Sequence, residues 1–503
     1  MNVGEWISKR ALVRPDRPLI KDGDRELNNL EFDRAVNRAA HALASLGLTK
    51  GDRLSVLMDN SIEFLEIFFA CAKLGLIFTP LGVQLAVPDL KFMLGDAAPK
   101  VLVYGPIAEK NIAALRPDFP RGPKFIPLGA DHDPEGLLAL AASASEAAPV
   151  PASEVDDDDP FLIIYVPGLS GDPKGAVLSH DNILFGAINS ILGFGLDQTY
   201  RSLVVAPLSQ IGALTASAAT VIYAGGSLAL KSFYNPSEIV ETIVREKITF
   251  MFAVPVMFQM MAKAPEWSSA DFSHVHHFIA GGAPMPVDVI RKYQEEKNIH
   301  FVQGYGMTET GRLTALDIED SRRKAGSVGK EVFHVQLRIV DDDGAEVPRG
   351  EIGEVIVRGP NVFREYWKRP EDNKKSLRDG WFYTADLGRR DEEGFIYLEG
   401  RKVETIISSG RNIYPAEVTR VLLTVPGVRE AVVVGLPDPG KGQVVGAAVV
   451  GDNLTKDGIL AFMEGRLAAY KTPKRMLILD AIPKIPIGFP DKDKIRKMMS
   501  PEG

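Results

Sequence analysis

The chain has 503 residues, and its 58 Lys and Arg against 66 Asp and Glu give a formal net charge of −8. Hydrophobic residues make up 45% and charged residues 25%, the usual balance of a globular protein. This length favours roughly two to four domains. A single cysteine, Cys71, excludes an internal disulfide and a zinc cluster built on cysteines. The acidic charge, spread along the chain, argues against nucleic acid as the main partner.

The start of the chain carries no export signal that we recognise. It has no basic segment leading into an apolar one. The most apolar early stretch, 64–78, contains Glu66 and Lys73 and is too short to span a bilayer. We therefore expect a cytoplasmic protein without a membrane span.

The first part of the chain alternates helices with buried strands. Apolar residues at helical spacing predict a helix over 32–43, and Gly47 marks its end. Short apolar runs predict strands at 54–58 and 101–104, with a helix over 63–74 between them. This alternation is typical of a doubly wound sheet, so the expected fold class is α/β.

Residues 141–159 break this pattern, because Ala, Ser and Pro are followed by four consecutive aspartates. We interpret the segment as a solvated connector rather than an acidic docking patch. An apolar strand at 161–165 follows, and it leads into a glycine-rich loop. Further buried strands are expected at 205–207, 248–254, 277–280 and 354–357.

The pattern changes near residue 400. Strand-like runs at 431–435 and 444–450, with an amphipathic helix over 455–467, predict a small α+β domain of about 100 residues. We therefore expect a large domain over 1–400, made of doubly wound mixed sheets with helices, and a small one over 401–503.

The loop at 168–175 combines closely spaced glycines with Lys174. Glycines let backbone N–H groups approach an anion, and a lysine adds charge, so phosphate is the natural ligand. The loop lacks the Gly-Lys-Ser/Thr sequence that opens a helix in Walker-type loops. Taken alone, it fits an ordinary surface turn equally well.

Six further motifs follow in order: Gly281-Gly282-Ala283-Pro284, Gly304-Tyr305-Gly306-Met307-Thr308-Glu309, 350–354, 380–386, Gly400-Arg401-Lys402 and 408–417. From residue 14 to residue 495 the chain resembles the acyl-adenylate-forming (ANL) superfamily, in its acyl-CoA synthetase/ligase branch. The resemblance implies a small, mobile C-terminal lid domain beside the large N-terminal domain. It also implies a two-step reaction, in which a carboxylate and ATP give acyl-AMP and pyrophosphate before coenzyme A displaces AMP.

The resemblance assigns roles to individual residues. Asp386 would accept the ribose hydroxyls, and Arg401 would reach the ribose or the α-phosphate. Thr308 would donate to the same phosphate, and Glu309 would hold Mg²⁺ through carboxylate oxygen. The remaining implied sites are the adenine-flanking Gly281, Gly282, Ala283, Pro284, Gly304, Tyr305 and Gly306; the phosphate loop Gly168, Ser170, Gly171 and Lys174; the acyl pocket Gln210, Gly212 and Ala213; the coenzyme A tunnel Ser409 and Gly410; and the hinge Val403.

The sequence departs from the family pattern mainly on the side of the first step. Val166, Pro167 and Leu169 replace hydroxyl residues of the phosphate loop, and hydrogen bonds to charged groups contribute about 1.5–3 kcal/mol each. Phe489 stands where the family has its adenylation lysine, and loss of one such donor lowers a rate by about 10²–10³. Valine at hinge position 403 is β-branched and stiff, and Gln210 stands where many acyl-CoA ligases have histidine.

The residues that serve AMP and the loop around Gly410 are kept, whereas those that serve the attack of carboxylate on ATP are lost. We therefore expect an acyl-CoA ligase-like enzyme that is specialised for, or limited to, transfer of the acyl group from preformed acyl-AMP to coenzyme A. A partner ligase would supply the adenylate, and the oligomeric state, with a homodimer as one option, stays open. Small apolar residues after Gln210 favour a hydrophobic acyl group.

Four alternatives remain. The chain could be a complete carboxylic acid–CoA ligase that uses ATP with Mg²⁺ and has weakened adenylation. It could be a non-catalytic relative that binds AMP or acyl-AMP. The other two alternatives are an adenylation domain that loads a carrier protein and a luciferase-type oxygenase.

Overall fold

The computed structural model describes residues 1–129, 136–151, 153–167, 172–282, 285, 287–321, 323–324, 326–484 and 490–500. Their contacts divide the chain into two compact units. Unit 1 comprises Met1–Leu337 and Val357–Phe382, and unit 2 comprises Arg338–Ile356 and Tyr383–Gly503. This division differs from a boundary at residue 400, because 338–356 and 383–400 belong to unit 2. A lid that begins at residue 401 stays a prediction.

The first seven-stranded sheet of unit 1 is mainly parallel. Its strands, in spatial order, are β13 (Phe301–Val302), β12 (His277–Ala280), β11 (Phe250–Ala253), β9 (Arg201–Val204), β10 (Ser227–Leu230), β1 (Pro18–Asp22) and β2 (Arg25–Asn28). All neighbours pair in parallel except β1 and β2. The carboxyl ends of β9, β11, β12 and β13 therefore meet at one edge.

The second seven-stranded sheet of unit 1 carries the expected phosphate loop between two of its strands. Its order is β20 (Glu365–Tyr366), β8 (Lys174–Ser179), β7 (Pro160–Val166), β4 (Ile77–Leu81), β3 (Arg53–Leu57), β5 (Val101–Tyr104) and β6 (Lys124–Pro127). Strands β7 and β8 pair antiparallel, with Val166 opposite Lys174. The predicted doubly wound mixed sheets are confirmed.

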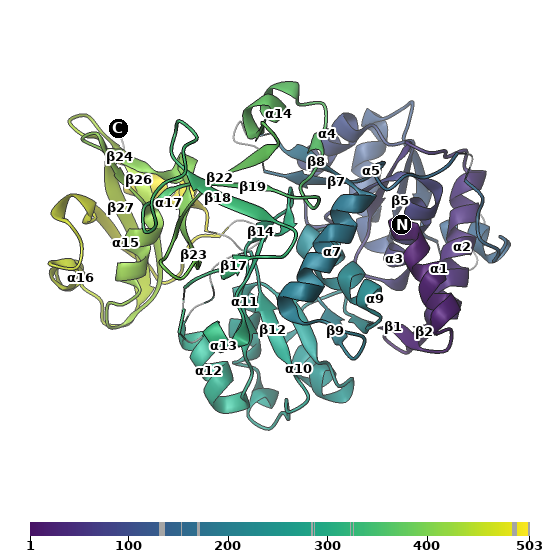
Figure 1. The fold of residues 1–503 in the computed structure, drawn as a ribbon, viewed down its shortest axis with the longest axis horizontal. Helices are drawn as coiled ribbons and strands as arrows, with labels where there is room; N and C mark the ends of the chain where they lie inside the picture. Colours follow the sequence, from purple (N-terminus) through teal and green to yellow (C-terminus); the bar gives the residue numbers. More distant parts are fainter. Residues whose placement is uncertain are drawn as a thin grey trace. The chain divides into compact units, whose positions relative to one another are not determined.

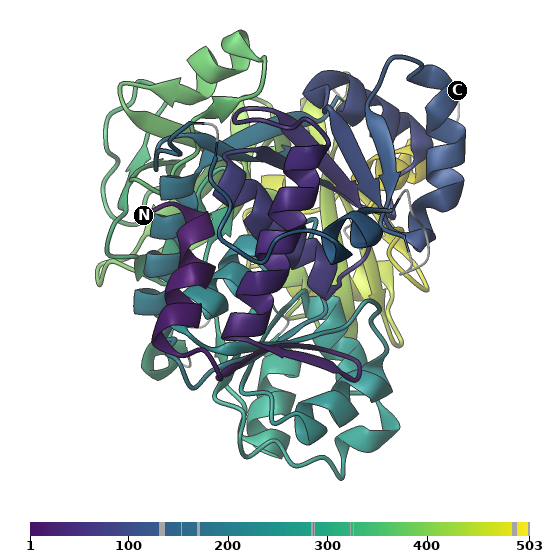
Figure 2. The same ribbon diagram turned by 90° about the vertical axis from the view of Figure 1, so that its right-hand side faces the viewer.

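Helices cover and separate these sheets. Helix α3 (Ile62–Leu74), which starts at the Ser61 cap and ends at left-handed Gly75, contacts β4 of one sheet and β1 of the other. Figure 2 shows α1 (Val3–Val13) and α2 (Asn29–Ser45) side by side in purple. The other helices of unit 1 are α4 (Val87–Ala97), α5 (Glu109–Leu115), α6 (Leu137–Ala142), α7 (His180–Phe194), α8 (Ile211–Ala213), α9 (Thr220–Ala224), α10 (Pro236–Arg245), α11 (Pro255–Met261), α12 (Val287–Lys297), α13 (Ile318–Ser321) and α14 (Pro370–Ser376).

Single helical turns and short hairpins complete unit 1. They are η1 (Pro106–Ala108), η2 (Arg116–Asp118), the π-helix η3 (Leu214–Ala219), η4 (Pro265–Trp267), the hairpin β14 (Gly306–Met307) with β15 (Gly311–Arg312), the pair β16 (Thr314–Ala315) with β17 (Lys330–Glu331), and β21 (Leu377–Arg378). Figure 1 shows α10, α11 and α12 gathered around the part of unit 1 that carries β12. Among the described helices, none is long and apolar enough to cross a membrane.

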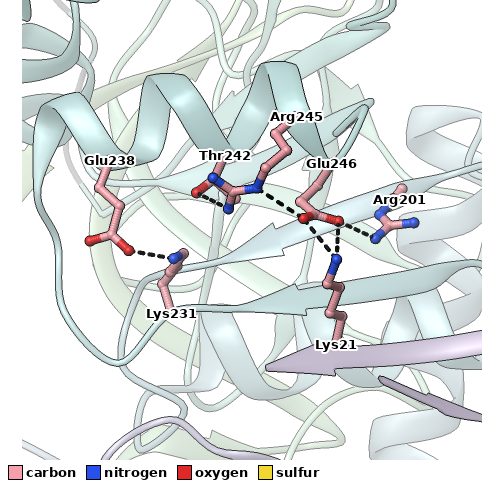
Figure 3. A network of polar contacts seen from close by, with 7 residues as sticks. All are labelled: Lys21, Arg201, Lys231, Glu238, Thr242, Arg245 and Glu246. Atoms are coloured by element: carbon pink, nitrogen blue, oxygen red, sulfur yellow. Dashed lines mark hydrogen bonds and ion pairs between the residues drawn. The ribbon is translucent and has the colours of Figure 1, made fainter. Parts of the chain in front are cut away.

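A cluster of charged side chains fastens α10 to the first sheet. Glu246, at the end of α10, accepts hydrogen bonds from Lys21 on β1 at 2.9 and 3.0 Å and from Arg201 on β9 at 2.8 Å. Arg245 contributes a third cation at 3.2 Å (Figure 3). Burial opposes ionisation of Glu246, but these hydrogen bonds and charges hold the pKa of its carboxyl below the ordinary value. The cluster therefore ties the end of α10 to β1 and β9.

Unit 2 has a sheet covered on both faces. Its strands are β25 (Arg411–Ile413), β24 (Ile406–Ser408), β27 (Gly442–Gly451), β26 (Val428–Asp438) and β28 (Arg475–Ile478), the last paired with β27. Alternate residues of β27 point to opposite faces. Val445 packs with α15 (Pro415–Leu422) and α16 (Lys456–Met463), whereas Val444 packs with α17 (Lys492–Met499). The strands therefore read as continuous apolar runs, as 431–435 and 444–450 predicted.

The remaining strands form one sheet, and the boundaries between the two units fall within three of its strands. Its order is β18 (Gln336–Val340), β19 (Gly353–Arg358), β22 (Trp381–Arg390) and β21, with β23 (Ile396–Arg401) paired to β22. In unit 2, β22 and β23 place Asp386 opposite Arg401. Two single turns, η5 (Lys402–Glu404) and η6 (Ala469–Lys471), complete the unit.

Two expected elements are wrong in position. The strand expected at 205–207 is the segment after β9, which ends at Val204. The helix expected over 455–467 ends at Met463, because Glu464 is extended and Gly465 has a positive φ of 76°. In the first case an apolar run continues past the end of the strand, and in the second Leu467 keeps the helical spacing beyond the point where the helix ends.

The expected connector over 141–159 packs along α2 for part of its length. Asn37 donates to the Glu146 carbonyl at 2.9 Å, and Arg38 bonds the Glu146 carboxylate at 2.6 Å. Its aspartates form ion pairs: Asp157 with the N-terminal amine at 2.5 Å, Asp158 with Arg364 at 2.6 Å and Asp159 with Lys50 at 2.7 Å. The acidic run is therefore engaged within unit 1.

Candidate active site

Residues expected to line the acyl pocket and residues expected to flank the adenine lie together at the carboxyl edge of the parallel sheet in unit 1. Gln210 and Gly212 follow β9, Gly281 follows β12 and Gly304 follows β13. Ligands of open α/β sheets bind at this edge. Four segments that are far apart in the sequence thus meet where a substrate is expected.

A single aromatic ring connects two of these glycines. A Cβ placed on Gly212 would lie 2.7 Å from Cε1 and Cζ of Phe252, and one on Gly281 would lie 2.4 Å from Cε2 of the same ring. Real Cβ atoms do not approach so closely, so both positions require glycine as long as the ring stays there. Phe252, near the end of β11, therefore forms an apolar wall of the predicted pocket.

The segment that leads to Gln210 is held by a buried amide. Asn60, 4% exposed, donates to the carbonyls of Ala206 and Lys231 at 3.0 and 3.1 Å. Its own oxygen accepts from the N–H of Leu208 at 2.8 Å. The Gln210 N–H also donates to the Pro207 carbonyl at 3.0 Å, so these bonds hold the turn that leads to Gln210 and Ala213.

The Tyr305 motif forms the tight hairpin β14–β15. Tyr305 is buried, and its backbone N–H donates to Thr314 Oγ1 at 2.9 Å. Thr308 and Glu309 lie in the turn, where the 4%-exposed Glu309 accepts a hydrogen bond from the Tyr366 hydroxyl at 2.7 Å. Glu309 is therefore a buried carboxylate beside a neutral donor, which fits its expected role as a Mg²⁺ ligand.

Lys174, the charge of the expected phosphate loop, has a carboxylate partner in unit 1. Its Nζ lies 2.8 Å from Oδ1 of Asp372, on α14, and 5.3 Å from the centre of the Tyr366 ring. A phosphate that binds here must therefore compete with Asp372. Tyr366 links Lys174 to Glu309, so the phosphate side of unit 1 is one connected cluster.

Unit 2 holds the residues expected to bind ribose. Asp386 Oδ1 lies 3.1 Å from Nε of Arg401, across the β22–β23 pair. The Asp386 backbone N–H donates to Thr384 Oγ1 at 3.0 Å, and Thr384 in turn donates to the Val355 carbonyl at 2.8 Å. The carboxylate of Asp386 and the guanidinium of Arg401 therefore lie side by side. A carboxylate can accept a hydrogen bond from a ribose hydroxyl, and a guanidinium can bind a phosphate.

The expected hinge Val403 lies in η5 and is 57% exposed. The residue before it, Lys402, bonds Asp342 at 2.8 Å and Glu354 at 2.9 Å, and its pKa is raised because these carboxylates outweigh the effect of burial. Glu404, after the hinge, bonds Lys492 at 2.6 Å. The Lys492 side chain is therefore engaged within unit 2.

A polar hollow of about 280 Å³ lies in unit 2 beside the expected coenzyme A tunnel. It is lined by Ser408, Ser409, Arg411, Lys441, Val444, Val445, Tyr470 and Lys474. The Arg411 guanidinium lies 4.9 Å from the centre of the Tyr470 ring. Ser409 and Gly410 have positive φ values of 51° and 74°, which turn the backbone at its rim. Three cations, two hydroxyls and an aromatic ring suit a phosphorylated, ring-containing ligand.

Several expected site residues lie outside the described residues: Gly168, Ser170, Gly171, Ala283, Pro284 and Phe489. Gly282, which is described, has a positive φ of 81°. In the described part of the chain, no group of three or more His, Cys, Asp or Glu side chains could hold a metal ion. Glu309 is therefore expected to act with the ligand's own oxygens.

Sequence reasoning missed Tyr366, Asp372, Phe252 and the cations Lys441 and Lys474. The pairing of Lys174 with Asp372 joins residues about 200 positions apart, which no local pattern reveals. A signal was present only for Lys474, because the stretch Tyr470-Lys471-Thr472-Pro473-Lys474 gathers charge around an aromatic residue. Unit 1 carries the residues expected to contact the acyl group and the phosphates, and unit 2 carries those expected to contact the ribose and coenzyme A.

Comparisons with known proteins identify the family of the chain. The family "AMP-binding enzyme" matches residues 7–367, and "AMP-binding enzyme C-terminal domain" matches residues 417–488. A feruloyl-CoA synthase of Amycolatopsis sp is 36% identical over 501 residues, covering 98% of each chain. The long-chain-fatty-acid–CoA ligase FadD13 of Mycobacterium tuberculosis is 36% identical over 510 residues, covering 99% of each. The crystal structure of ATP-bound MatB from Rhodopseudomonas palustris superposes with a TM-score of 0.90 at 30% identity, covering 99% of each chain.

The chain belongs to the AMP-binding enzyme family. Within that family it is an enzyme of the acyl-CoA synthetase/ligase branch of the acyl-adenylate-forming superfamily. The family uses ATP with Mg²⁺, forms acyl-AMP and transfers the acyl group to coenzyme A. The donors and acceptors described above fit these groups: Asp386 and Arg401 would hold AMP, and Glu309 would hold Mg²⁺.

Proposed function

We propose that this enzyme is specialised for the second half of the family reaction, the transfer of an acyl group from preformed acyl-AMP to coenzyme A. The observation that carries the proposal is phenylalanine at position 489, where the family pattern has the adenylation lysine. Negative charge crowds together when a carboxylate attacks ATP, and one well-placed donor is worth about 10²–10³ in rate. A phenyl ring supplies no such donor.

Two structural features support the proposal. Lys492 and Lys494 follow position 489 closely in the sequence, and the first of them bonds Glu404 at 2.6 Å. The thiol side keeps its charged hollow, lined by Arg411, Lys441 and Lys474. In this proposal these cations bind the phosphates of coenzyme A, and Ser409 and Gly410 line the path of its thiol arm.

The transfer step needs little from the protein beyond positioning. The thiol sulfur bonds to the acyl carbonyl carbon, and the bond from that carbon to the phosphate oxygen breaks. AMP leaves with the electron pair, and the thiol proton passes to solvent. Arg401 would stabilise the negative charge on the departing phosphate, and Asp386 would hold the ribose in place.

The test supplies synthetic acyl-AMP with coenzyme A in one reaction, and free acid with ATP, Mg²⁺ and coenzyme A in another. We expect thioester mainly from the first. Equal turnover in the second would show a complete ligase and would refute the specialisation. Asp386→Asn serves as the negative control, because it should weaken both reactions through loss of the ribose acceptor.

The alternatives give different outcomes in the same experiment. A complete carboxylic acid–CoA ligase with weakened adenylation gives slow but measurable thioester from acid and ATP. A non-catalytic relative binds acyl-AMP in calorimetry but makes no thioester from either mixture. The retained hollow beside Ser409 favours transfer over simple binding, since a protein that only binds AMP needs no site for coenzyme A.

An enzyme limited to the second step needs a source of acyl-AMP. In this proposal a partner adenylating ligase in the cytoplasm supplies it. Co-purification, with a reaction that needs both proteins and ATP, would support that partner. Gel filtration with light scattering would show whether the chain acts alone or as a homodimer.

A further inference from the structure

Arg312 is a buried cation that no described residue neutralises. It lies on β15, is 7% exposed and forms no ion pair with any carboxylate of the described residues. Its Nε is buried and has no hydrogen-bond acceptor among them. Burial lowers the pKa of the guanidinium to about 10, so Arg312 still carries its charge at neutral pH.

The surroundings of Arg312 contain an aromatic ring and backbone but no acid. Its guanidinium carbon lies 4.3 Å from the centre of the Phe194 ring, at the end of α7. Asn361 donates to the backbone carbonyl of Arg312 at 3.3 Å, which leaves the guanidinium untouched. Glu309, the acid of the same hairpin, accepts instead from Tyr366 at 2.7 Å. Folding therefore maintains an uncompensated charge, which is strongly unfavourable unless a ligand or solvent meets it.

The position of this charge relates it to the acyl pocket. A Cβ placed on Gly304 would lie 2.6 Å from Nη1 of Arg312, so the guanidinium rests directly against the Gly304 backbone. Gly304 follows β13 at the same sheet edge as Gly281, which follows the neighbouring strand β12, and Phe252 lies on β11, the next strand in spatial order. The π-helix η3, which continues from Gln210 and Ala213, contacts β15. Arg312 thus stands at the same edge of the sheet as the pocket-lining residues.

We propose that Arg312 recognises a second carboxylate on the acyl group, so that preferred substrates are acyl-adenylates whose far end is acidic. A planar guanidinium binds carboxylate through paired hydrogen bonds, and it does so most effectively away from water. The apolar wall at Phe252 would contact the carbon chain, and Arg312 would meet its terminus. The inference refines the expected hydrophobic acyl group and rests on the proposed function.

The test compares pairs of synthetic acyl-adenylates that differ only by a terminal carboxylate, such as hexanoyl-AMP and its ω-carboxy counterpart, over a range of chain lengths. For the best length, kcat/KM with coenzyme A should be about 10- to 100-fold higher for the carboxylate-bearing member, the range that hydrogen bonds to charged groups provide. Equal values or a preference for the uncharged member would overturn the inference.

Binding separates this inference from the proposed function. Unreactive sulfamate analogues of the two adenylates can be compared by calorimetry, without any turnover. Tighter binding of the carboxylate-bearing analogue supports the role of Arg312 even if no thioester forms. Equal affinity refutes that role even if the protein transfers acyl groups efficiently.

Variants assign the preference to this residue. Arg312→Met keeps the length of the side chain without its charge, so the two kcat/KM values should become equal, through KM rather than kcat. Arg312→Lys should retain part of the preference, because it keeps the charge without the paired geometry.

A uniform loss for both adenylates would mean that Arg312 serves the shared AMP part, and would refute the inference. Removal of an unpaired buried charge should leave the melting temperature equal or higher; should Arg312→Met nevertheless fail to fold, the comparison of analogues in the unmodified protein decides.

Discussion

The expected phosphate cluster of unit 1 and the hollow of unit 2 differ in whether their cations are paired with a carboxylate. Lys174 is paired with Asp372 at 2.8 Å and lies over Tyr366. Arg411, Lys441 and Lys474, which line the hollow of unit 2, form no ion pair with a described carboxylate. A paired cation must exchange its partner before it binds phosphate, whereas an unpaired one is ready to do so.

This difference corresponds to the two steps of the family reaction. The first step handles pyrophosphate and depends on the loop that ends at Lys174. The second step handles coenzyme A, whose phosphates need cations on the thiol side. In this chain the first set is reduced in sequence and Lys174 is paired with Asp372. The cations that we propose bind coenzyme A form no ion pair with a described carboxylate. Substitutions that restore the first set, or that remove cations of the second set, test this contrast between the two steps.

The largest effect is expected from Phe489→Lys, which restores the family residue. Thioester formation from acid, ATP and coenzyme A should rise by about 10²–10³, because a cation again meets the charge that develops during adenylation. The rate from acyl-AMP should not rise, since that step begins after adenylation. Pyrophosphate release and thioester formation, measured together, check both statements.

Phe489→Met is the matched control, because it changes the ring without adding charge. If Phe489→Lys folds normally and gives no more pyrophosphate than Phe489→Met, the missing lysine is not what limits the first step. The comparison between the two sides would then have to rest on the loop residues Val166, Pro167 and Leu169.

The next effect concerns the hollow in unit 2. Lys474→Met should raise the KM for coenzyme A about tenfold, near the lower end of what a hydrogen bond to a charged group provides. The KM for pantetheine, which has the thiol arm but no phosphates, should stay the same as in the unmodified protein. Lys456→Met, which removes an exposed lysine of α16 in the same unit, is the control.

The comparison with pantetheine decides what the hollow binds. If Lys474→Met raises both KM values together, the residue acts on the shape of unit 2 and not on the phosphates. Added salt should also raise the KM for coenzyme A, because it screens exposed charges, and this dependence should weaken in the variant.

A smaller effect is expected from Asp372→Asn, which frees Lys174. An exposed or half-exposed ion pair contributes about 0–1 kcal/mol, so adenylation should improve by no more than about fivefold. The gain should be larger when Phe489→Lys is also present, because both changes then act on the same step. Glu371→Gln, one residue earlier on α14, removes the same charge without touching this pair. A loss of activity in Asp372→Asn would contradict the idea that Asp372 restrains Lys174.

The sequence predicted the elements whose signals are local. The strand at 277–280 and the apolar runs at 431–435 and 444–450 are found where expected, since each is a short and largely buried run. The strand expected at 205–207 is misplaced, because β9 begins with Arg201 and Ser202 and its apolar residues continue into the turn. Gly465 could have marked the end of α16, where a positive φ ends the helix.

Contacts between residues far apart in the chain could not be predicted from the sequence. The pairing of β22 and β23 with the earlier strands is what assigns 338–356 and 383–400 to unit 2. The motif residues Asp386 and Arg401 were found through the resemblance, yet their mutual contact follows from strand register. Arg312 was missed because nothing in a Gly-Arg-Leu-Thr sequence tells whether the arginine faces water. Its burial is known only once β14, β15 and α7 are placed together.

The smallest expected effect on either step comes from Glu246→Gln, in the cluster of Figure 3. The Glu246 side chain is 10% exposed and is surrounded by Lys21, Arg201 and Arg245, so the substitution leaves three cations without their shared carboxylate. The free energy of unfolding should fall by about 1–2 kcal/mol. Both half reactions should keep their rates at temperatures where the variant is folded. Glu238→Gln, which removes the 49%-exposed partner of Lys231 in the same view, should change stability much less.

The stabilising effect of Glu246 should depend on pH in a definite direction. The pKa of Glu246 is lowered in the folded protein, despite partial burial, by hydrogen bonds from Lys21 and Arg245 and by the charge of Arg201. A lowered carboxyl pKa adds stability above the unfolded value of about 4.3, and that stability disappears as the pH falls through the folded value. The difference in unfolding free energy between the unmodified protein and Glu246→Gln should therefore be full at neutral pH and shrink in acid. A difference that grew in acid, or a change in the ratio of the two half reactions, would mean that this cluster communicates with the site and that the contrast between the two sides is not local.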